Sequence, residues 1–214
     1  MPGTEGHRYS ADFIEKKFKE AGLKKVKREA FKSVIPVEKY AYITVDNKKI
    51  DIHCLWPNLV RTSTVPPDGL TGKLIYGGNG DLRNLTGKDI EGNIIVLDFD
   101  SGTRWQTLAM LGARAFIFTD KGDITRIQAE QKFVDIPVNI PRFYAYKNSQ
   151  TIMDLAREEK EVRLSGRMDW EKVTDYNIYG YLEGRDKKLK DEVIILQAYY
   201  DSMGVVPAIA SGAS

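Results

Sequence analysis

The sequence predicts a mixed α/β fold, a sheet of parallel and antiparallel strands covered by helices. Two continuous apolar runs, residues 94–97 (IIVL) and 193–196 (VIIL), have the length and composition of strands that are buried on both faces. Residues 9–21 carry an apolar side chain at every third or fourth position, as an amphipathic helix does. Strand-like and helix-like segments alternate along the chain, and this alternation is typical of α/β proteins.

The composition limits the classes of partner that we expect for this chain. The 214 residues carry a net charge of +2 and 29% charged residues, an ordinary balance for a globular protein, so we expect no nucleic acid partner. No apolar run approaches the roughly 20 residues of a membrane span, so we expect membrane association only through segments outside this sequence. Pro2 follows Met1 without a signal-peptide pattern, and we expect the sequence to be a fragment.

The first 50 residues predict one helix and two strands. Thr4 and Glu5 belong to a turn that we expect to cap the helix over residues 9–21, which ends at Gly22. Two antiparallel strands follow, at residues 25–34 and 40–45. The basic residues near 24–28 lack interleaved aromatic residues, so we expect a solvated strand face rather than a nucleic-acid site.

The middle of the chain, about residues 52–166, predicts a separate set of strands and helices. Its elements are strands at 74–76, 94–97 and 112–118, helices at 103–111 and 147–159, and an extended segment at 136–141. The glycine-rich turn at 77–80 lacks the spacing and the Ser or Thr of a phosphate-binding loop, so we expect an ordinary loop.

The last segment carries the candidate site. A strand at 176–184 and a charged turn at 185–191 precede the apolar run at 193–196, which leads into a loop with Tyr199 and Asp201. Loops at the carboxyl ends of such strands line the usual ligand crevice of α/β proteins. The single cysteine excludes an internal disulfide and a cysteine-based zinc site. The two histidines, His7 and His53, stand in no spaced ligand motif, and we expect each to have a surface or capping role.

The loop resembles the first metal-ligand loop of the M28 family of zinc exopeptidases. Residues 198–202 read Ala-Tyr-Tyr-Asp-Ser where that family has Ala-His-Tyr-Asp-Ser, and residues 212–214 match the start of its Gly-Ala-Asp-Asp-Asn. Further matches are the Gly-Thr-Glu-Gly turn at 3–6 and the Asn-x-x-Gly-x-Leu-x-Gly pattern at 177–184. The resemblance implies part of a phosphorylase/hydrolase-like mixed sheet, zinc as the cofactor, and aminopeptidase- or carboxypeptidase-type hydrolysis of peptide bonds.

Two departures from the family pattern concern the metal. Tyr199 occupies the position of the first zinc-binding histidine, and the sequence stops one residue before the bridging aspartate would fall. The phenol of tyrosine has a pKa of about 10 and is mostly a neutral oxygen donor, so we expect this chain not to bind the zinc. Asp201 matches the carboxylate that orients the ligand histidine in the family, which makes it the candidate catalytic residue.

The middle block resembles the protease-associated (PA) domain. The matching order is strand, helix, Gly-Ala, strand and Ile-Pro-Val, at residues 92–98, 108–118 and 136–140. PA domains are inserted into M28 peptidases at this point, where they serve as lids, control substrate access or contact partners. The resemblance implies a β-rich α+β insert at 51–168 within a discontinuous peptidase-like domain of residues 1–50 and 169–214.

Three functions stay open at this point. The chain is the N-terminal part of an M28-like metallopeptidase, a pseudo-peptidase that binds peptides or proteins, or a stand-alone PA-like binding module. The loop at 204–207 also resembles the nicalin/nicastrin branch, whose members have lost metal ligands and work in membrane complexes. The resemblance implies a peptide or protein partner and an extracytoplasmic location, either secreted, periplasmic or tethered to a membrane. The sequence after Ser214 would discriminate, through further ligands or membrane spans.

Overall fold

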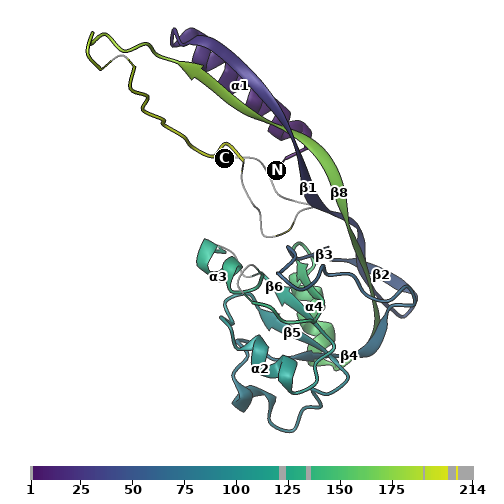
Figure 1. Cartoon of the computed structure of the whole chain (residues 1–214). Helices are drawn as coiled ribbons and strands as arrows, with labels where there is room; N and C mark the ends of the chain where they lie inside the picture. The colour runs from purple at the N-terminus through teal and green to yellow at the C-terminus, as the bar shows by residue number, and fades with distance from the viewer. Residues whose placement is uncertain (1, 121–123, 134–135, 190, 202–205, 207–214) are drawn as a thin grey trace. The chain divides into compact units, whose positions relative to one another are not determined.

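The computed structural model describes residues 2–120, 124–133, 136–189, 191–201 and 206, and it has the mixed α/β fold that the sequence predicts (Figure 1). The helices are α1 (Glu5–Glu20), α2 (Trp105–Met110), α3 (Arg126–Glu130) and α4 (Ser149–Arg157), with a short 3-10 helix, η1 (Leu82–Leu85). The strands are β1 (Lys24–Val45), β2 (Lys48–Asp51), β3 (His53–Cys54), β4 (Leu70–Tyr76), β5 (Ile94–Asp98), β6 (Ala115–Thr119), β7 (Arg142–Ala145) and β8 (Glu161–Tyr181).

Eight strands form one mixed sheet in the order β2-β1-β8-β4-β5-β6-β7-β3. The four strands β4, β5, β6 and β7 run parallel to one another. Antiparallel pairs join β1 to β2, β4 to β8 and β3 to β7. Because parallel neighbours need crossover connections, the helices of the middle block lie between its strands in sequence.

The chain divides into two compact units, and the division falls within β1 and within β8. The described residues of the first unit lie within 2–35 and 170–201, and those of the second unit lie within 36–169 and at Val206. The predicted insert, 51–168, lies inside the second unit, which also takes in residues 36–50. Its identity as a PA domain stays a prediction.

The second unit is built around the parallel strands, which are buried on both faces. All five residues of β5 are buried, as the apolar run at 94–97 predicts. Alternate side chains of β5 enter two different apolar clusters: Ile94 and Val96 enter one, Ile95 and Leu97 the other. Helix α4 contributes to the first cluster and α2 to the second, so the sheet of this unit has a helix on each face (Figure 1).

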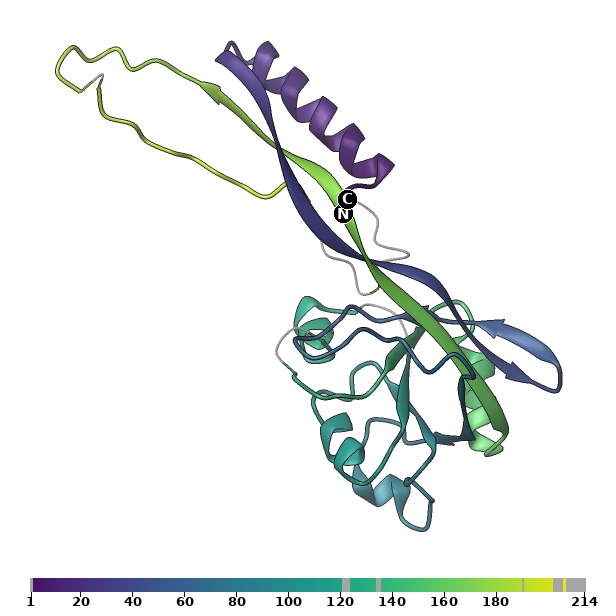
Figure 2. The ribbon, with the colours of Figure 1, turned by 45° about the vertical axis from the view of Figure 1, so that its right-hand side comes forward.

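The first unit has α1 beside the outer parts of the two long strands (Figure 2). Thr4 caps the helix, because its hydroxyl accepts a hydrogen bond from the backbone N–H of His7 at 3.3 Å, and this confirms the expected capping turn. The helix therefore begins at Glu5, four residues earlier than the apolar pattern alone indicates. Gly22 follows the helix with a φ of 78°, a conformation that glycine adopts without strain.

The predicted pair of strands at 25–34 and 40–45 is wrong, because both segments belong to the single strand β1. The residues between them offer no turn signal: Pro36 has the extended φ that a strand tolerates, and no Gly, Asn or Asp lies nearby. Residues 136–141, predicted as an extended segment, belong to no helix or strand, and β7 begins at Arg142.

The predicted buried strand at 193–196 is also wrong. These residues form no strand, and their side chains are largely exposed, 88% in the case of Ile194. A strand buried on both faces needs neighbours, and no described strand pairs with this segment. The side chains of this run are apolar enough to be buried, but no described helix or strand covers them.

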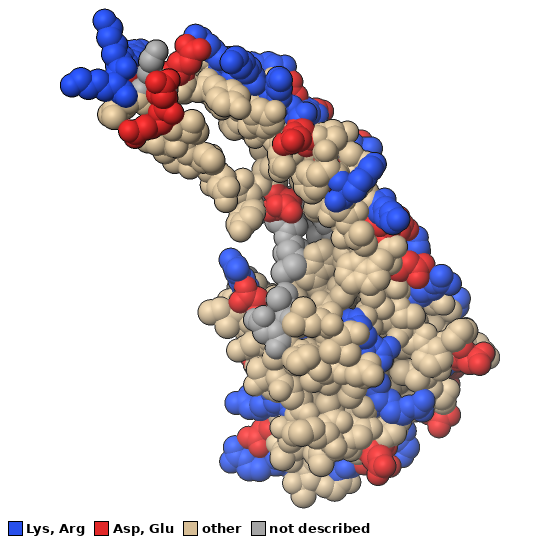
Figure 3. All heavy atoms as spheres, viewed as in Figure 1, with Lys and Arg blue, Asp and Glu red and all other residues tan. Residues whose placement is uncertain are grey.

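Basic side chains of β1 are matched by acidic side chains of the first unit. Lys24 pairs with Glu183, and Arg28 pairs with Asp12 and Glu15. On the face shown in Figure 3, basic and acidic side chains are interspersed among the described residues. The arrangement is the solvated strand face expected from the sequence.

Candidate functional site

The described side chains of the predicted metal loop differ in their exposure to solvent. Tyr199, at the position of the family's first zinc ligand, is 94% exposed, and Asp201 is exposed as well. Tyr200 between them is half-buried. The matches at Ser202 and at 212–214, and three of the four loop residues at 204–207, lie outside the described residues. The roles assigned to Tyr199 and Asp201 stay predictions.

The described residues do not fit a zinc site. No group of three or more His, Cys, Asp or Glu side chains within the described ranges could hold a metal ion. A two-zinc hydrolytic site needs such a cluster, with the metals about 3.5–4 Å apart. The exposed phenol of Tyr199 and the exposed carboxylate of Asp201 provide neither the imidazole nor the enclosure that zinc sites use.

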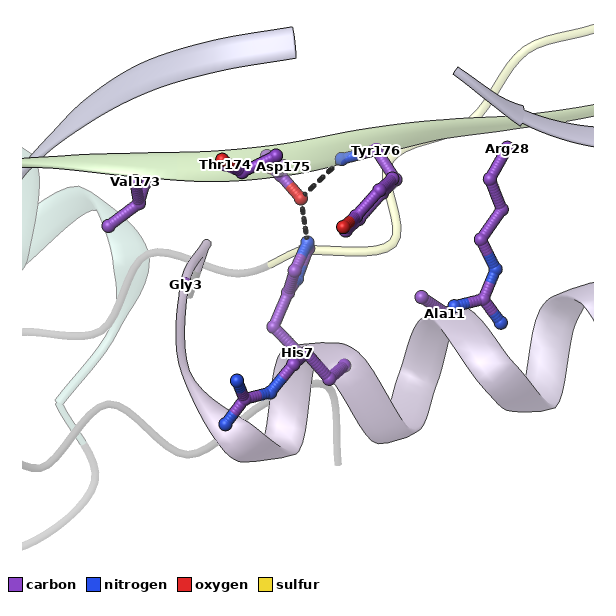
Figure 4. Close-up of a pocket in the computed structure, with 9 residues that line it drawn as sticks. Gly3, His7, Ala11, Arg28, Val173, Thr174, Asp175 and Tyr176 are labelled. Carbon is purple, nitrogen blue, oxygen red and sulfur yellow. Dashed lines mark hydrogen bonds and ion pairs between the residues drawn. The ribbon is translucent and has the colours of Figure 1, made fainter. Parts of the chain in front are cut away.

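The expected surface or capping role of His7 is wrong. His7 is 4% exposed, and its Nε2 atom lies 2.6 Å from Oδ1 of Asp175 on β8, which is buried too. The helix begins early enough to place His7 in its first turn, where the side chain faces β8 (Figure 4). The N-cap signal at Thr4 was the feature of the sequence that could have placed His7 within the helix.

The hydrogen bonds assign the proton of His7. Oδ1 of Asp175 also accepts the backbone N–H of Tyr176 at 2.8 Å, so the carboxylate acts as an acceptor towards both groups. Nε2 of His7 therefore donates. The other ring nitrogen, Nδ1, is buried without a partner among the described residues.

Tyr200 completes this cluster. Its ring stacks on the ring of His7, with centroids 4.6 Å apart and planes 16° apart, and its hydroxyl donates to the backbone oxygen of Tyr176 at 2.6 Å. Burial raises the pKa of Tyr200 to about 12, and the charges of Asp175 and Asp201 act in the same direction. The phenol is therefore neutral at physiological pH.

A pocket of about 260 Å³ in the first unit lies beside the cluster (Figure 4). Its lining comes from the turn before α1 and from α1, β1 and β8, and consists of Gly3, His7, Arg8, Ala11, Arg28, Val173, Thr174, Asp175 and Tyr176. The lining contains no cysteine or lysine, and its carboxylate is already bonded to His7 and to the Tyr176 amide. The arrangement fits a role in holding segments together better than one in covalent catalysis.

The second histidine, His53, takes part in a structural contact with a carboxylate. Nδ1 of His53 lies 3.1 Å from Oε1 of Glu38, while the other oxygen of this carboxylate accepts the backbone N–H of Cys54. Burial, aided by the charge of Glu38, raises the pKa of the Cys54 thiol far above its usual range. The thiol is therefore not a nucleophile at physiological pH.

Two cations are buried in the second unit among aromatic rings. Lys132 is fully buried, with its Nζ atom over the rings of Phe99 and Phe118 at 5.6 and 5.1 Å, and it donates to the backbone oxygen of Gly102. Burial lowers its pKa to about 8, against an opposing effect of Asp100. Arg142 is fully buried too, 6.0 Å from the ring of Trp105, and burial lowers its pKa to about 10. Ring faces partly replace water around both charges.

The chain is similar to known proteins in structure but not in sequence. No protein-family model matches the sequence, and no curated protein matches it. Several solved structures do. A zinc aminopeptidase from Bacillus subtilis matches with a TM-score of 0.57 and 19% identity over 87% of this chain and 43% of its own. A Peptidase M28 precursor from Shewanella amazonensis SB2B matches with a TM-score of 0.51 and 16% identity over 85% of this chain and 46% of its own.

The chain shares the fold of these peptidase structures. An aminopeptidase from Aneurinibacillus sp. strain AM-1 matches as well, with a TM-score of 0.50 and 17% identity over 88% of this chain and 45% of its own. The chain thus spans less than half the length of each of these proteins. At such low identity the similarity establishes the fold, and activity has to be argued from the residues. No helix within the described ranges has the length and apolar character to cross a membrane.

Proposed function

We propose that this chain is the N-terminal portion of an M28-like metallopeptidase in which the first zinc position has been lost, so that peptide-bond hydrolysis is impaired. The observation that carries the proposal is the state of the metal loop: Tyr199 replaces the histidine, and its side chain is 94% exposed. A phenol turned to solvent is a poor replacement for an imidazole held in an enclosed site.

The fold supports descent from a peptidase. The matching structures include a protein described as a zinc aminopeptidase. The shared fold covers 87% of the present chain. Asp201 keeps the family's carboxylate beside the changed position. Without an imidazole to orient, the Asp201 carboxylate loses its catalytic purpose, and peptide hydrolysis would need ligands that the described chain does not provide.

A second candidate is a pseudo-peptidase that binds peptides or proteins through the PA-type insert. The second unit favours it, because its parallel strands have apolar clusters on both faces and form a compact body of their own. A nicalin-like member of a membrane complex is one form of this candidate. The two candidates differ in one measurable property, the binding of peptides or proteins by the second unit, which only the pseudo-peptidase requires.

Zinc binding of the complete gene product tests the proposal. Equilibrium dialysis should give at most one weakly bound zinc per chain for the parent, and no release of amino acids from a panel of unblocked peptides. Tyr199→His supplies the missing imidazole, and Tyr9→His, at another exposed tyrosine of the first unit, is the matched control. Two tightly bound zinc ions with aminopeptidase turnover in the parent would refute the proposal.

A further inference from the structure

We propose that His7, Asp175 and Tyr200 form a positioning clamp, which holds the Tyr199–Asp201 loop so that the side chains on either side of Tyr200 face solvent. The inference rests on the proposed function in one respect, the interpretation of this loop as a former metal loop. The contacts themselves belong to the first unit and are independent of that interpretation.

First, His7 is held in one position by contacts to two other residues. Its backbone N–H is bound by the Thr4 hydroxyl, which ties the residue to the start of α1, and its Nε2 atom is bound by Asp175 on β8. The carboxylate is itself held by the Tyr176 amide. His7 is thus held at its backbone by Thr4 and at Nε2 by Asp175, and both side chains are buried. A ring held in this way is a rigid surface for a second ring.

The second step is the capture of Tyr200. One contact is the stack on His7, with 4.6 Å between centroids, and the other is the hydrogen bond from the Tyr200 hydroxyl to the Tyr176 backbone oxygen at 2.6 Å. A stacked aromatic pair contributes about 0.5–1.5 kcal/mol beyond the area that it buries. The two contacts fix the ring in position and in direction, since one acts on its face and the other on its end.

The third step concerns the neighbours of Tyr200. When one side chain of an extended segment turns inward, the residues before and after it point the other way. Tyr199 and Asp201 are both exposed, as this alternation requires. Bringing Tyr199 inward would require Tyr200 to leave both of its contacts. The clamp therefore selects which residue of the loop faces the protein.

This role is one of positioning. His7 and Asp175 touch each other, Tyr176 and Tyr200, and the free ring nitrogen of His7 is buried. The charged groups around the cluster are Arg8 on α1, Arg28 on β1, and Asp201 on the loop. Arg28 is already paired with Asp12 and Glu15. None of these contacts requires a substrate or a metal.

Site-resolved nitration of tyrosine tests the clamp without any reference to peptidase activity. Tetranitromethane attacks the phenolate, and mass spectrometry of the peptide that holds both residues separates Tyr199 from Tyr200. In the parent, Tyr199 should react at least roughly tenfold faster than Tyr200, because the raised pKa of Tyr200 reduces its phenolate and the stack covers its ring. Equal rates in the parent would overturn the proposal.

Substitutions then identify the cause of the protection. His7→Ala should raise the nitration rate of Tyr200 roughly tenfold and leave that of Tyr199 unchanged. His53→Ala removes the other histidine–carboxylate contact and should leave both rates unchanged. Protection of Tyr200 that persists in a folded His7→Ala chain would overturn the proposal.

A measurement on the unmodified chain covers the case in which His7→Ala does not fold. Nuclear Overhauser contacts between the ring protons of His7 and Tyr200 should be strong at the observed separation of the rings. Their absence in the folded parent would overturn the clamp. Zinc content and peptide hydrolysis enter none of these measurements, so failure of the clamp and failure of the proposed function give different results.

Discussion

His7 and Asp175 are separated by 168 positions in the sequence, yet Nε2 of one lies 2.6 Å from Oδ1 of the other. The pair joins the first turn of α1 to β8, and both side chains are buried. Ala11 is the other buried residue of α1, so this helix has few buried contacts besides the pair. We therefore expect the stability of the first unit to depend strongly on one hydrogen-bonded pair.

Asp175→Ala should lower the free energy of unfolding of the first unit by about 1.5–3 kcal/mol, because it leaves a buried Nε2–H donor without its charged acceptor. Trp170 lies in this unit, and its fluorescence during chemical denaturation would report the change. Glu183→Gln is the control, because its pair with Lys24 is exposed to solvent and should contribute little to stability. Equal effects of the two substitutions would contradict the account.

The pH dependence of the second unit should carry a contribution from Lys132. Burial lowers the pKa of Lys132 from 10.5 to about 8 in the folded chain. The unfolded chain therefore binds more protons between about pH 8 and 10.5, and the stability contribution of this residue should rise with pH across that window. Lys132→Met should remove this rise.

The measurement for Lys132 is a difference between two pH profiles. Denaturation midpoints of the parent and of Lys132→Met, recorded from pH 7 to 10.5, cancel the groups that both chains share. The parent should gain stability relative to Lys132→Met as the pH increases, since the cost of the buried charge disappears. A constant difference across the window would show that Lys132 keeps an ordinary pKa.

Two isoleucines in similar apolar runs should respond differently to truncation. Ile94→Ala removes a fully buried side chain from β5 and should cost about 2–5 kcal/mol. Ile194→Ala, in the run that looks the same in sequence, should change stability by less than about 0.5 kcal/mol because its side chain is exposed. Thermal or chemical denaturation of this chain measures both. A large loss of stability from Ile194→Ala would indicate that residues 193–196 form the buried strand that the sequence predicts.

Two glycines give a matched test of packing. A Cβ at Gly166 would lie 2.5 Å from Cε1 of Phe143, so Gly166→Ala should destabilise the second unit by about 1–3 kcal/mol. A Cβ at Gly6, within α1, would meet nothing within 4 Å, so Gly6→Ala should stabilise the helix by about 0.5–1 kcal/mol. Melting temperatures of the two variants should move in opposite directions. Shifts in the same direction would contradict the described packing.

The fold class could be predicted from the sequence because apolar runs and apolar periodicity indicate which side chains are suited to burial. The run at 94–97 predicted a strand covered on both faces, and β5 is one. The run at 193–196 has the same composition but lies exposed, because composition cannot show whether neighbouring strands are available. The continuous course of β1 was missed for a related reason, since two apolar patterns separated by Pro36 read as two strands.

The candidate site was harder to predict, because its contacts join residues far apart in the chain. The loop at 198–202 could be found from its local pattern, but the pattern does not say which side chain turns inward. Tyr200 does so because His7 and Tyr176 bind it, and neither lies near it in sequence. The pairing of His7 with Asp175 has no local signal, apart from the capping turn that places His7 on a helix.

The proposed loss of the metal position at Tyr199 can be examined in crystals of the complete gene product grown with zinc. Anomalous diffraction at the zinc absorption edge locates any bound zinc. We expect no anomalous peak beside Tyr199 and Asp201. Two peaks there, about 3.5–4 Å apart, would refute the loss of the metal position.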